Sequence, residues 1–279
     1  MGTSYRIDSV SQLEQTLEQF PDMDCVVAGH ESCPVFYMQQ NVDEIAKRAL
    51  DKKIGVKINI PIVFEEYLDF FKGEAARLLE EHQQIKLVAN DWGMLYHLHS
   101  QHPKRKFAIG LGMSFSYADC PWNFHIVEGE LDKYKEMLLV HNLASTKALE
   151  IVKGLGADEI IMGNMKSLEA SYRIIQSCGL KVTVNRGVNI VTISRACHTL
   201  RILGKTSEKG NCAAYCKNRT ILKGTHYYDM SLGIHAAISE ETKAIQPEMH
   251  SYSNMLFTSG EQEGIDHSNV ADVINDYRI

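Results

Sequence analysis

The sequence predicts a single (β/α)₈ TIM-like barrel, and three observations lead to this prediction. Short β-branched runs alternate with longer helix-like segments along most of the 279 residues, as expected for parallel strands joined by crossover helices. Several runs are apolar at every position, which is typical of strands covered on both faces. A doubly wound open sheet is the alternative, but residues 29–33 lack the glycine-rich phosphate loop that it would place after the first run.

The elements follow one another in a regular order. Eight strands are predicted, over residues 25–29, 54–60, 85–89, 106–111, 137–141, 159–162, 181–184 and 227–234. Helices are predicted over 42–52, 64–82, 92–101, 145–155 and 167–178. The last two of these helices end beside Gly156 and Gly179, where glycine can take the left-handed conformation of a C-terminal cap.

The domain prediction is one barrel over residues 1–279, in which 240–279 form a C-terminal extension that closes with a short helix near 269–277. One connection stands out. Residues 186–223, between predicted strands seven and eight, form a long loop that contains Cys197, Cys212 and Cys216. Long loops in compact domains are usually functional, so we expect this loop to contribute to the site.

Composition narrows the classes of function. The net charge of −6 and the pI near 6.1 argue against a nucleic-acid-binding surface, which is normally basic. No apolar run approaches the roughly 18 residues that span a membrane, and no secretory signal is visible at the N-terminus. We therefore expect a cytoplasmic protein. In a reducing compartment, seven cysteines indicate metal binding or catalysis rather than disulfides.

Four of the cysteines form a candidate metal centre. Cys33 follows a predicted strand, on the same end of the barrel as the loop that contains Cys197, Cys212 and Cys216. Cys212 and Cys216 are four residues apart, so they would share one face if this segment is helical. Thiolates are soft ligands that suit an iron–sulfur cluster or zinc. Structural zinc sites usually contain closely spaced C-x₂-C pairs, which this sequence lacks, but zinc stays the alternative. Buried packing roles are expected for the two remaining cysteines with clear positions, Cys25 and Cys178.

Polar residues recur where the predicted strands end, which is where barrel enzymes place their active sites. Asn90 and Asp91 follow the third strand and are expected to point over the barrel mouth, although helix capping is the simpler role for such residues. Asn142 and Glu169 are expected to help shape the pocket, although Glu169 would instead lie in the first turn of a helix if Ser167 is its N-cap. The catalytic candidates are Asp91, Asn90, His30, His198 and Arg195, the last three as proton shuttles or anion-holding groups.

Several segments resemble the collagenase-like peptidase U32 family. They are Ser-Arg-Ala-Cys-His at 194–198, Cys-Ala-Ala-Tyr-Cys-Lys at 212–217, Ala-Asn-Asp-Trp-Gly at 89–93 and Asn-Leu-Ala-Ser at 142–145. One early and three late cysteines resemble the UbiU/UbiV-like branch of oxygen-independent hydroxylation proteins. This resemblance implies a 4Fe–4S cluster held by Cys33, Cys197, Cys212 and Cys216. The chain departs from the family at 110–116, where relatives tend to have Gly-Arg-x-x-Asn.

The function implied is that of an oxidoreductase that takes part in oxygen-independent hydroxylation of a small aromatic molecule. One alternative is a U32-type peptidase or other hydrolase, although the chain has no Gly-x-Ser-x-Gly or His-Glu-x-x-His sequence. The other is a non-catalytic, cluster-bearing partner of a paralogous hydroxylase. The expected partners are a small-molecule substrate, a redox partner and a paralogous subunit of the same family.

Overall fold

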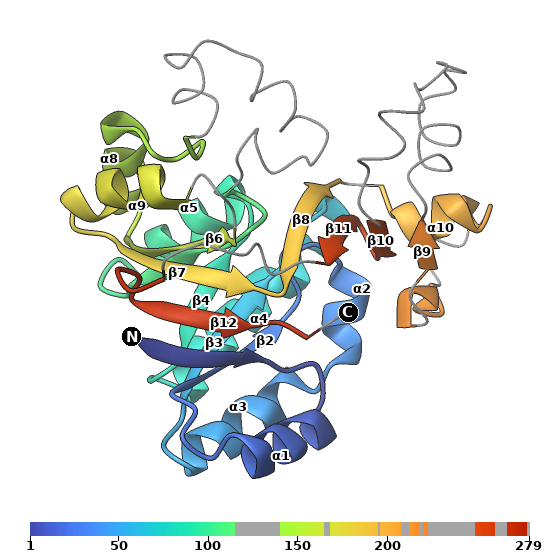
Figure 1. Ribbon diagram of the computed structural model, residues 1–279. Helices are drawn as coiled ribbons and strands as arrows, with labels where there is room; N and C mark the ends of the chain where they lie inside the picture. Colours follow the sequence, from blue (N-terminus) through green and yellow to red (C-terminus); the bar gives the residue numbers. More distant parts are fainter. Residues whose placement is uncertain are drawn as a thin grey trace.

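The computed structural model describes residues 1–114, 140–164, 168–194, 196–207, 212–217, 220–222, 249–259 and 267–277. Its centre is a closed barrel of eight parallel strands in the order β1-β12-β7-β6-β5-β4-β3-β2 (Figure 1). Each strand is joined to neighbours on both sides, so the barrel has no open edge. The predicted (β/α)₈ fold is confirmed.

The barrel strands are β1 (Gly2–Arg6), β2 (Cys25–Gly29), β3 (Gly55–Ile60), β4 (Lys86–Ala89), β5 (Phe107–Ile109), β6 (Ala157–Gly163), β7 (Lys181–Arg186) and β12 (Asp272–Asn275). The helices that follow barrel strands are α1 (Val10–Gln19), α2 (Pro34–Gln39), α3 (Val42–Asp51), α4 (Leu68–Glu81, after the 3₁₀ turn η1, Glu65–Tyr67), α5 (Trp92–Gln101), α8 (Thr146–Gly154) and α9 (Leu168–Ser177). All five predicted helices are confirmed to within a few residues.

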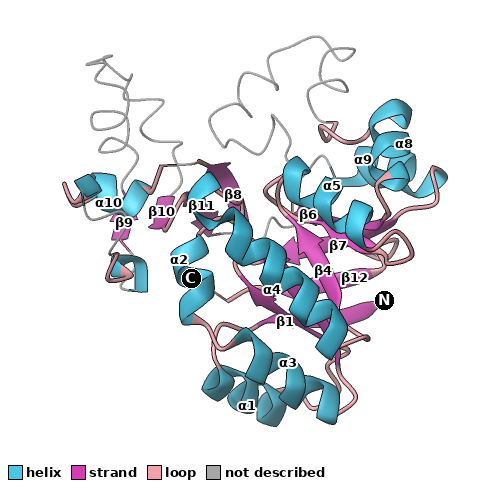
Figure 2. Cartoon of the chain, turned by 180° about the vertical axis from the view of Figure 1, so that it is seen from behind, coloured by secondary structure: helices cyan, strands magenta, loops and turns pink. Residues whose placement is uncertain are grey.

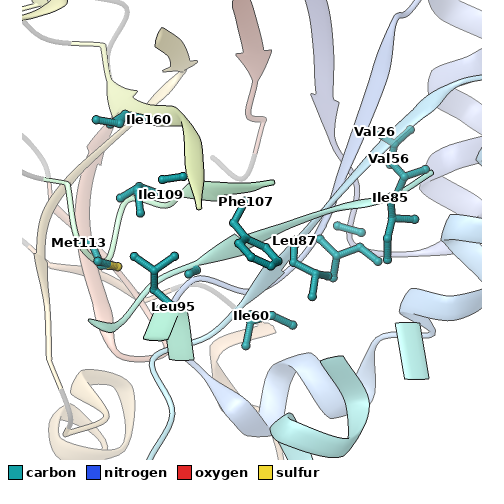
Figure 3. Close-up of a cluster of buried hydrophobic side chains, with 14 of the residues drawn as sticks. Val26, Val56, Ile60, Ile85, Leu87, Leu95, Phe107, Ile109, Met113 and Ile160 are labelled. Atoms are coloured by element: carbon teal, nitrogen blue, oxygen red, sulfur yellow. The ribbon is translucent and has the colours of Figure 1, made fainter. Parts of the chain in front are cut away.

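Successive apolar residues of each strand pack on opposite faces of the barrel wall, because side chains alternate along a strand. Val26 packs in the outer core between sheet and helices, and its neighbour Val27 packs inside the barrel. Figure 3 shows part of the outer core, where Leu87 and Phe107 of adjacent strands lie near Leu95 of α5. Burial on both faces explains why the strands are apolar at every position.

Charged residues occupy the barrel wall where the strands begin. Lys57 Nζ donates to Glu159 Oε1 at 2.5 Å and to Asp272 Oδ2 at 2.9 Å. Lys86 Nζ lies 3.0 Å from Glu159 Oε2, and the Thr183 hydroxyl donates to Glu159 Oε1 at 2.6 Å. These contacts link strands β3, β4, β6, β7 and β12 around the barrel. They lie at the end opposite the one where barrel enzymes build active sites.

A second, four-stranded antiparallel sheet lies between β7 and β12 in the chain. Its order is β8 (Val188–Ile193), β11 (Met255–Ser259), β10 (Met249–Tyr252) and β9 (Thr220–Leu222). The same insert contains α10 (His198–Ile202) and the 3₁₀ turn η4 (Tyr215–Lys217). Figures 1 and 2 place the sheet beside α2, and Phe36 of α2 packs against Val188, Tyr252 and Phe257 of the sheet. The predicted cysteine-bearing connection between the seventh and eighth strands is therefore confirmed.

Two parts of the strand prediction need correction. The barrel includes β1 and β12, which were not predicted, and β12 lies where a short terminal helix was expected. β12 pairs with both β1 and β7, so residues 272–275 close the barrel and are not part of a trailing extension. The β-branched pair Val273-Ile274 favours a strand. Of the strands predicted at 137–141 and 227–234, residues 137–139 and 227–234 lie outside the described residues, and residues 140–141 are not in a strand.

Within the described ranges, none of the helices has the length and apolar character needed to cross a bilayer.

Candidate metal centre

The four predicted ligand cysteines meet at one place, between α2 and the inserted sheet. Cys33, Cys197 and Cys212 line a single pocket. Cys216 lies beside it, in the apolar cluster that Cys33 also contacts. The thiol of Cys33 is close enough to the other three for each to raise its pKa electrostatically. Cys25 begins strand β2 and Cys178 directly follows α9, so neither is part of this group.

Local backbone structure sets the position of Cys33. The residue follows β2 and is the N-cap of α2, with Pro34 in the first helical position, where proline is favoured. The Phe36 amide donates to Cys33 Sγ at 3.4 Å. His30 Nδ1 accepts hydrogen bonds from the amides of Ser32 and Cys33, both at 3.1 Å. The loop that holds Cys33 is therefore fixed at both of its ends.

Cys197 is held in the same way on the insert. It is the N-cap of α10, and its sulfur accepts from the Leu200 amide at 3.5 Å and donates to the Ser253 carbonyl at 3.5 Å. Cys212 and Cys216 would share a helical face only in a helical segment, and the structure does not have one there. Between them Ala214 has a φ of 53°, which interrupts any helix, and only the short η4 turn includes Cys216.

Burial controls the acidity of these thiols. It raises the pKa of Cys33 to about 12 and that of Cys216 to about 11, and it also raises the pKa of Cys197. Hydrogen bonds from the amides of Phe36 and Leu200 oppose these rises at Cys33 and Cys197. Four thiols so close together, one of them buried and three partly buried, would repel one another once ionised, and a bound cation is the usual way to hold them as thiolates.

The spacing of the sulfurs bears on which metal would fit. A tetrahedral zinc ion with Zn–S bonds of 2.3 Å needs sulfurs roughly 3.8 Å apart. Among the described residues, no three cysteine sulfurs lie within 4.8 Å of one another. An iron–sulfur cluster binds each thiolate to a different iron and so holds the sulfurs further apart. Four cysteines around one pocket are a donor set that either an iron–sulfur cluster or a zinc ion can use.

One other group of potential metal ligands lies on the surface of the described chain, formed by Asp43, Glu81 and His82. Arg77 already bridges it, since its Nη1 contacts Asp43 Oδ1 at 3.0 Å and also contacts Glu81. His82 Nε2 lies 2.9 Å from Asp43 Oδ1. This arrangement is an ion-pair network, and the guanidinium takes the place that a cation would need.

Apolar and aromatic side chains surround the cysteines. The rest of the pocket lining is Pro34, Val35, Phe64, Tyr67, Leu200 and Asn254. Burial raises the pKa of Tyr67, and Glu66, Cys33 and Cys212 add to the rise, which places its phenol near two of the thiols. Phe64, Tyr67 and Asn254 were not predicted as site residues. The Ser-Asn pair in the turn between β10 and β11 has a hairpin composition, but nothing local to it indicates a contact with Cys33.

The predicted catalytic residues separate into two groups. His30 and His198 lie at the cysteine centre, and both are buried. Burial and then Arg201 lower the pKa of His198 to about 4, so its ring is neutral at physiological pH. Asn90 lies at the barrel mouth, where its Nδ2 donates to the Ile60 carbonyl at 2.9 Å and its Oδ1 accepts from the Gly112 amide at 3.0 Å. Arg195 lies outside the described residues.

Asn90 also explains a sequence feature of the loop after β5. A Cβ at Gly110 would lie 2.2 Å from Asn90 Oδ1, and one at Gly112 would lie 2.6 Å from the Asn90 carbonyl oxygen. Both contacts are shorter than real side chains tolerate, so the loop needs glycine at both positions. Asn90 therefore connects the ends of neighbouring strands.

A second, interior pocket lies at the barrel mouth, and its polar lining comes from four strands or their ends. Arg6, Glu31, Asn59 and Asn185 line it together with apolar residues of the barrel interior. Arg6 Nη1 lies 2.8 Å from Glu31 Oε1, and both side chains are buried. Arg6 is on β1, a strand that the sequence did not predict.

The expected position of Asp91 over the barrel mouth is wrong. Asp91 is the N-cap of α5, with Oδ1 accepting from the Met94 amide at 2.7 Å and Oδ2 accepting from the Val63 amide at 2.9 Å. Both carboxylate oxygens therefore bind backbone amides. Glu169, which was expected in the pocket, is instead exposed in the first turn of α9. Its Oε1 lies 3.0 Å from Arg173 Nη2.

Changing Asp91 to Ala is expected to lower the free energy of unfolding by roughly 2 kcal/mol, because the cap and the tie to Val63 are lost together. Asp91→Asn keeps the acceptor for Met94 and should cost less. Ser145→Ala, which removes the cap of α8, is the matched control at roughly 1 kcal/mol. Urea unfolding measures all three. Wild-type stability in Asp91→Ala together with lost activity would return Asp91 to the catalytic candidates.

Comparison with known proteins supports the fold. No protein-family model and no curated protein matches the sequence. The structure of the U32 peptidase Mk0906 aligns with a TM-score of 0.50 at 12% identity, over 99% of this chain and 92% of that one. A Thermobacillus composti GH10 xylanase aligns at 0.42 and 10% identity over 69% of both chains. An Oleispira antarctica phosphodiesterase aligns at 0.41 and 10% identity, over 66% of this chain and 83% of that one. The alignment with Mk0906 shows a shared fold. No conclusion is based on the other two alignments.

Proposed function

We propose that the chain is a U32-like iron–sulfur enzyme that takes part in the oxygen-independent hydroxylation of a small aromatic molecule. The observation that carries the proposal is the meeting of Cys33, Cys197, Cys212 and Cys216 around one pocket, from parts of the chain far apart in sequence. A fold shared with a U32 peptidase over nearly the whole chain is consistent with it.

The chain's own residues have two tasks in this proposal. Four thiolates would supply one ligand for each iron of a 4Fe–4S cluster, which in such a site transfers single electrons. Phe64, Tyr67 and Leu200 would exclude water from it and offer an apolar, aromatic surface beside the thiols. Low solvent exposure and hydrogen bonds to sulfur both tune the potential of such a site, and the Phe36 and Leu200 amides provide such bonds.

One of the proposed partners follows from the same ligand count. With one cysteine for each iron, the protein ligands leave no iron position open, so we expect electron exchange with a separate redox partner. A paralogous subunit of the same family is the second proposed partner, and it would share the work of binding the small-molecule substrate.

Anaerobic purification tests the proposal directly. We expect about four irons and four sulfides for each chain and a broad visible absorption that bleaches on reduction with dithionite. Metal analysis of the same sample distinguishes an iron–sulfur cluster from a bound zinc ion. A preparation that contains zinc and no iron, even after reconstitution with iron and sulfide, would overturn the redox function and favour a structural metal site.

A further inference from the structure

The buried imidazole of His30 has a defined tautomer. Its Nδ1 accepts from two backbone amides, those of Ser32 and Cys33, each at 3.1 Å. A nitrogen that accepts two hydrogen bonds must present its lone pair, so the neutral ring has its proton on Nε2. The residue has no exposed surface. The ring stacks on Tyr252 at 5.5 Å and meets the edge of Phe36 at 5.1 Å, so it has little freedom to turn.

The protonated Nε2 faces the turn between β10 and β11. It lies 3.5 Å from the hydroxyl of Ser253, which in turn lies 3.3 Å from the hydroxyl of Ser32. Asn254 Nδ2 donates to the Ser32 carbonyl at 3.3 Å. The loop after β2 and this hairpin turn are therefore joined by several polar contacts, with His30 at their centre.

The same turn contacts the cysteines of the insert. The Ser253 carbonyl accepts from Cys197 Sγ at 3.5 Å. Burial raises the pKa of Cys216, and a hydrogen bond from the Ser253 backbone opposes that rise, so this backbone also touches the Cys216 thiol. Cys33 depends on the loop after β2, whereas Cys197 and Cys216 depend on the insert. His30 and Ser253 form the contact between the loop after β2 and the insert.

We infer that His30 is a positioning residue of the four-cysteine centre. Through Nδ1 it fixes the backbone of Cys33, and through Nε2–H it holds that loop against the Ser253 turn that contacts Cys197 and Cys216. The inference rests on the proposed metal-binding function and adds a residue that is not itself a ligand. Groups that orient metal ligands commonly change metal affinity by 10–100-fold when they are removed.

The chain contains a matched control. His141 is also buried, and its Nδ1 also accepts from a backbone amide two residues ahead, that of Leu143, at 3.2 Å. Its imidazole contacts no residue of the cysteine pocket among those described. Replacing His141 removes the same kind of buried acceptor without touching Cys33, which separates a general loss of stability from a loss of ligand positioning.

Two substitutions at position 30 separate the two nitrogens. His30→Asn keeps an acceptor close to the place of Nδ1, and His30→Gln keeps a donor close to the place of Nε2 but removes the acceptor for Cys33. In the anaerobically purified full chain, iron release to ferrozine should be about tenfold faster for His30→Gln. We expect His141→Gln to stay close to wild type. His30→Asn keeps the acceptor for Cys33 but loses the Nε2–H contact with Ser253, so it should release iron at a rate between those of wild type and His30→Gln. The g-values of the dithionite-reduced protein should move most in His30→Gln and should not move in His141→Gln.

Equal release rates and g-values for His30→Gln and wild type would overturn the inference, as would the same changes in His141→Gln. If the wild type itself contains no iron, the proposed function fails, and the metal-free protein still tests the positioning role. There, iodoacetamide should alkylate Cys33 faster in His30→Gln than in His30→Asn or wild type, as followed by mass spectrometry. Equal alkylation rates in the three proteins would then reject the positioning role of His30.

Discussion

Changing Cys33 to Ser should abolish the binding of iron, or leave a cluster that is lost during purification. Each thiolate of a four-cysteine site supplies one metal bond, and Cys33 is the one ligand that comes from the loop after β2. Iron and sulfide analysis of the anaerobically purified protein measures the effect. Because metal binding contributes to folding, the variant should also resist protease less well than the loaded wild type.

Cys178→Ser is the control for this experiment. Cys178 is a partly exposed free cysteine that directly follows α9, away from the pocket. Its replacement should leave the iron content unchanged and cost about 1 kcal/mol or less in stability. Full iron content in Cys33→Ser would show that the ligand assignment across the two halves of the site is wrong, and loss of iron in both variants would point to a general effect of cysteine replacement.

Changing Lys57 to Met should lower the free energy of unfolding by about 3–5 kcal/mol, the usual result of removing one partner from a buried ion pair. The ammonium group lies between the carboxylates of Glu159 and Asp272, and the substitution would leave the buried Glu159 and the partly buried Asp272 without their shared cation. Lys86 still contacts Glu159, so the lower part of this range is expected. Urea or thermal unfolding provides the measurement.

The same network makes stability depend on pH. Burial alone would raise the pKa of Glu159, but the ammonium groups of Lys57 and Lys86 outweigh it and lower the pKa from 4.5 to about 2. A carboxylate with a depressed pKa in the folded state stabilises the protein above pH 4.5, and this contribution is lost as the pH falls toward about 2. In Lys57→Met the loss should begin at a higher pH.

Arg48→Met is the control on the surface, since Arg48 pairs with Glu14 and Glu44 in water. Exposed pairs contribute little, so neither the stability nor its acid dependence should change measurably. If Lys57→Met were as stable as wild type at neutral pH, the charged residues at the start of the strands would not be a source of stability for the barrel.

Much of the fold could be predicted because its signals are local. Ser145 begins α8 as an N-cap, and Gly156 and Gly179 take positive φ angles just after α8 and α9. The alternation of strand and helix then indicates a barrel. β1 and β12 could not be found in this way, since their pairing joins residues more than two hundred positions apart and β12 has only the short β-branched pair Val273-Ile274 as a local signal.

The site was partly predictable for a different reason. The cysteines could be sorted by their position relative to strand ends, which separated Cys33 from Cys25. Asp91 shows the limit of that argument, because an aspartate after a strand suits a pocket rim and a helix cap equally well. The contact that decides between them, with the Val63 amide, comes from another loop.

The position of β12 has a consequence for how the molecule is made. Because β12 lies between β1 and β7, β1 stays without one neighbour until residues 272–275 have been synthesised. All four cysteines of the centre have emerged before that moment. During synthesis the cysteine-bearing insert therefore emerges before the barrel can close.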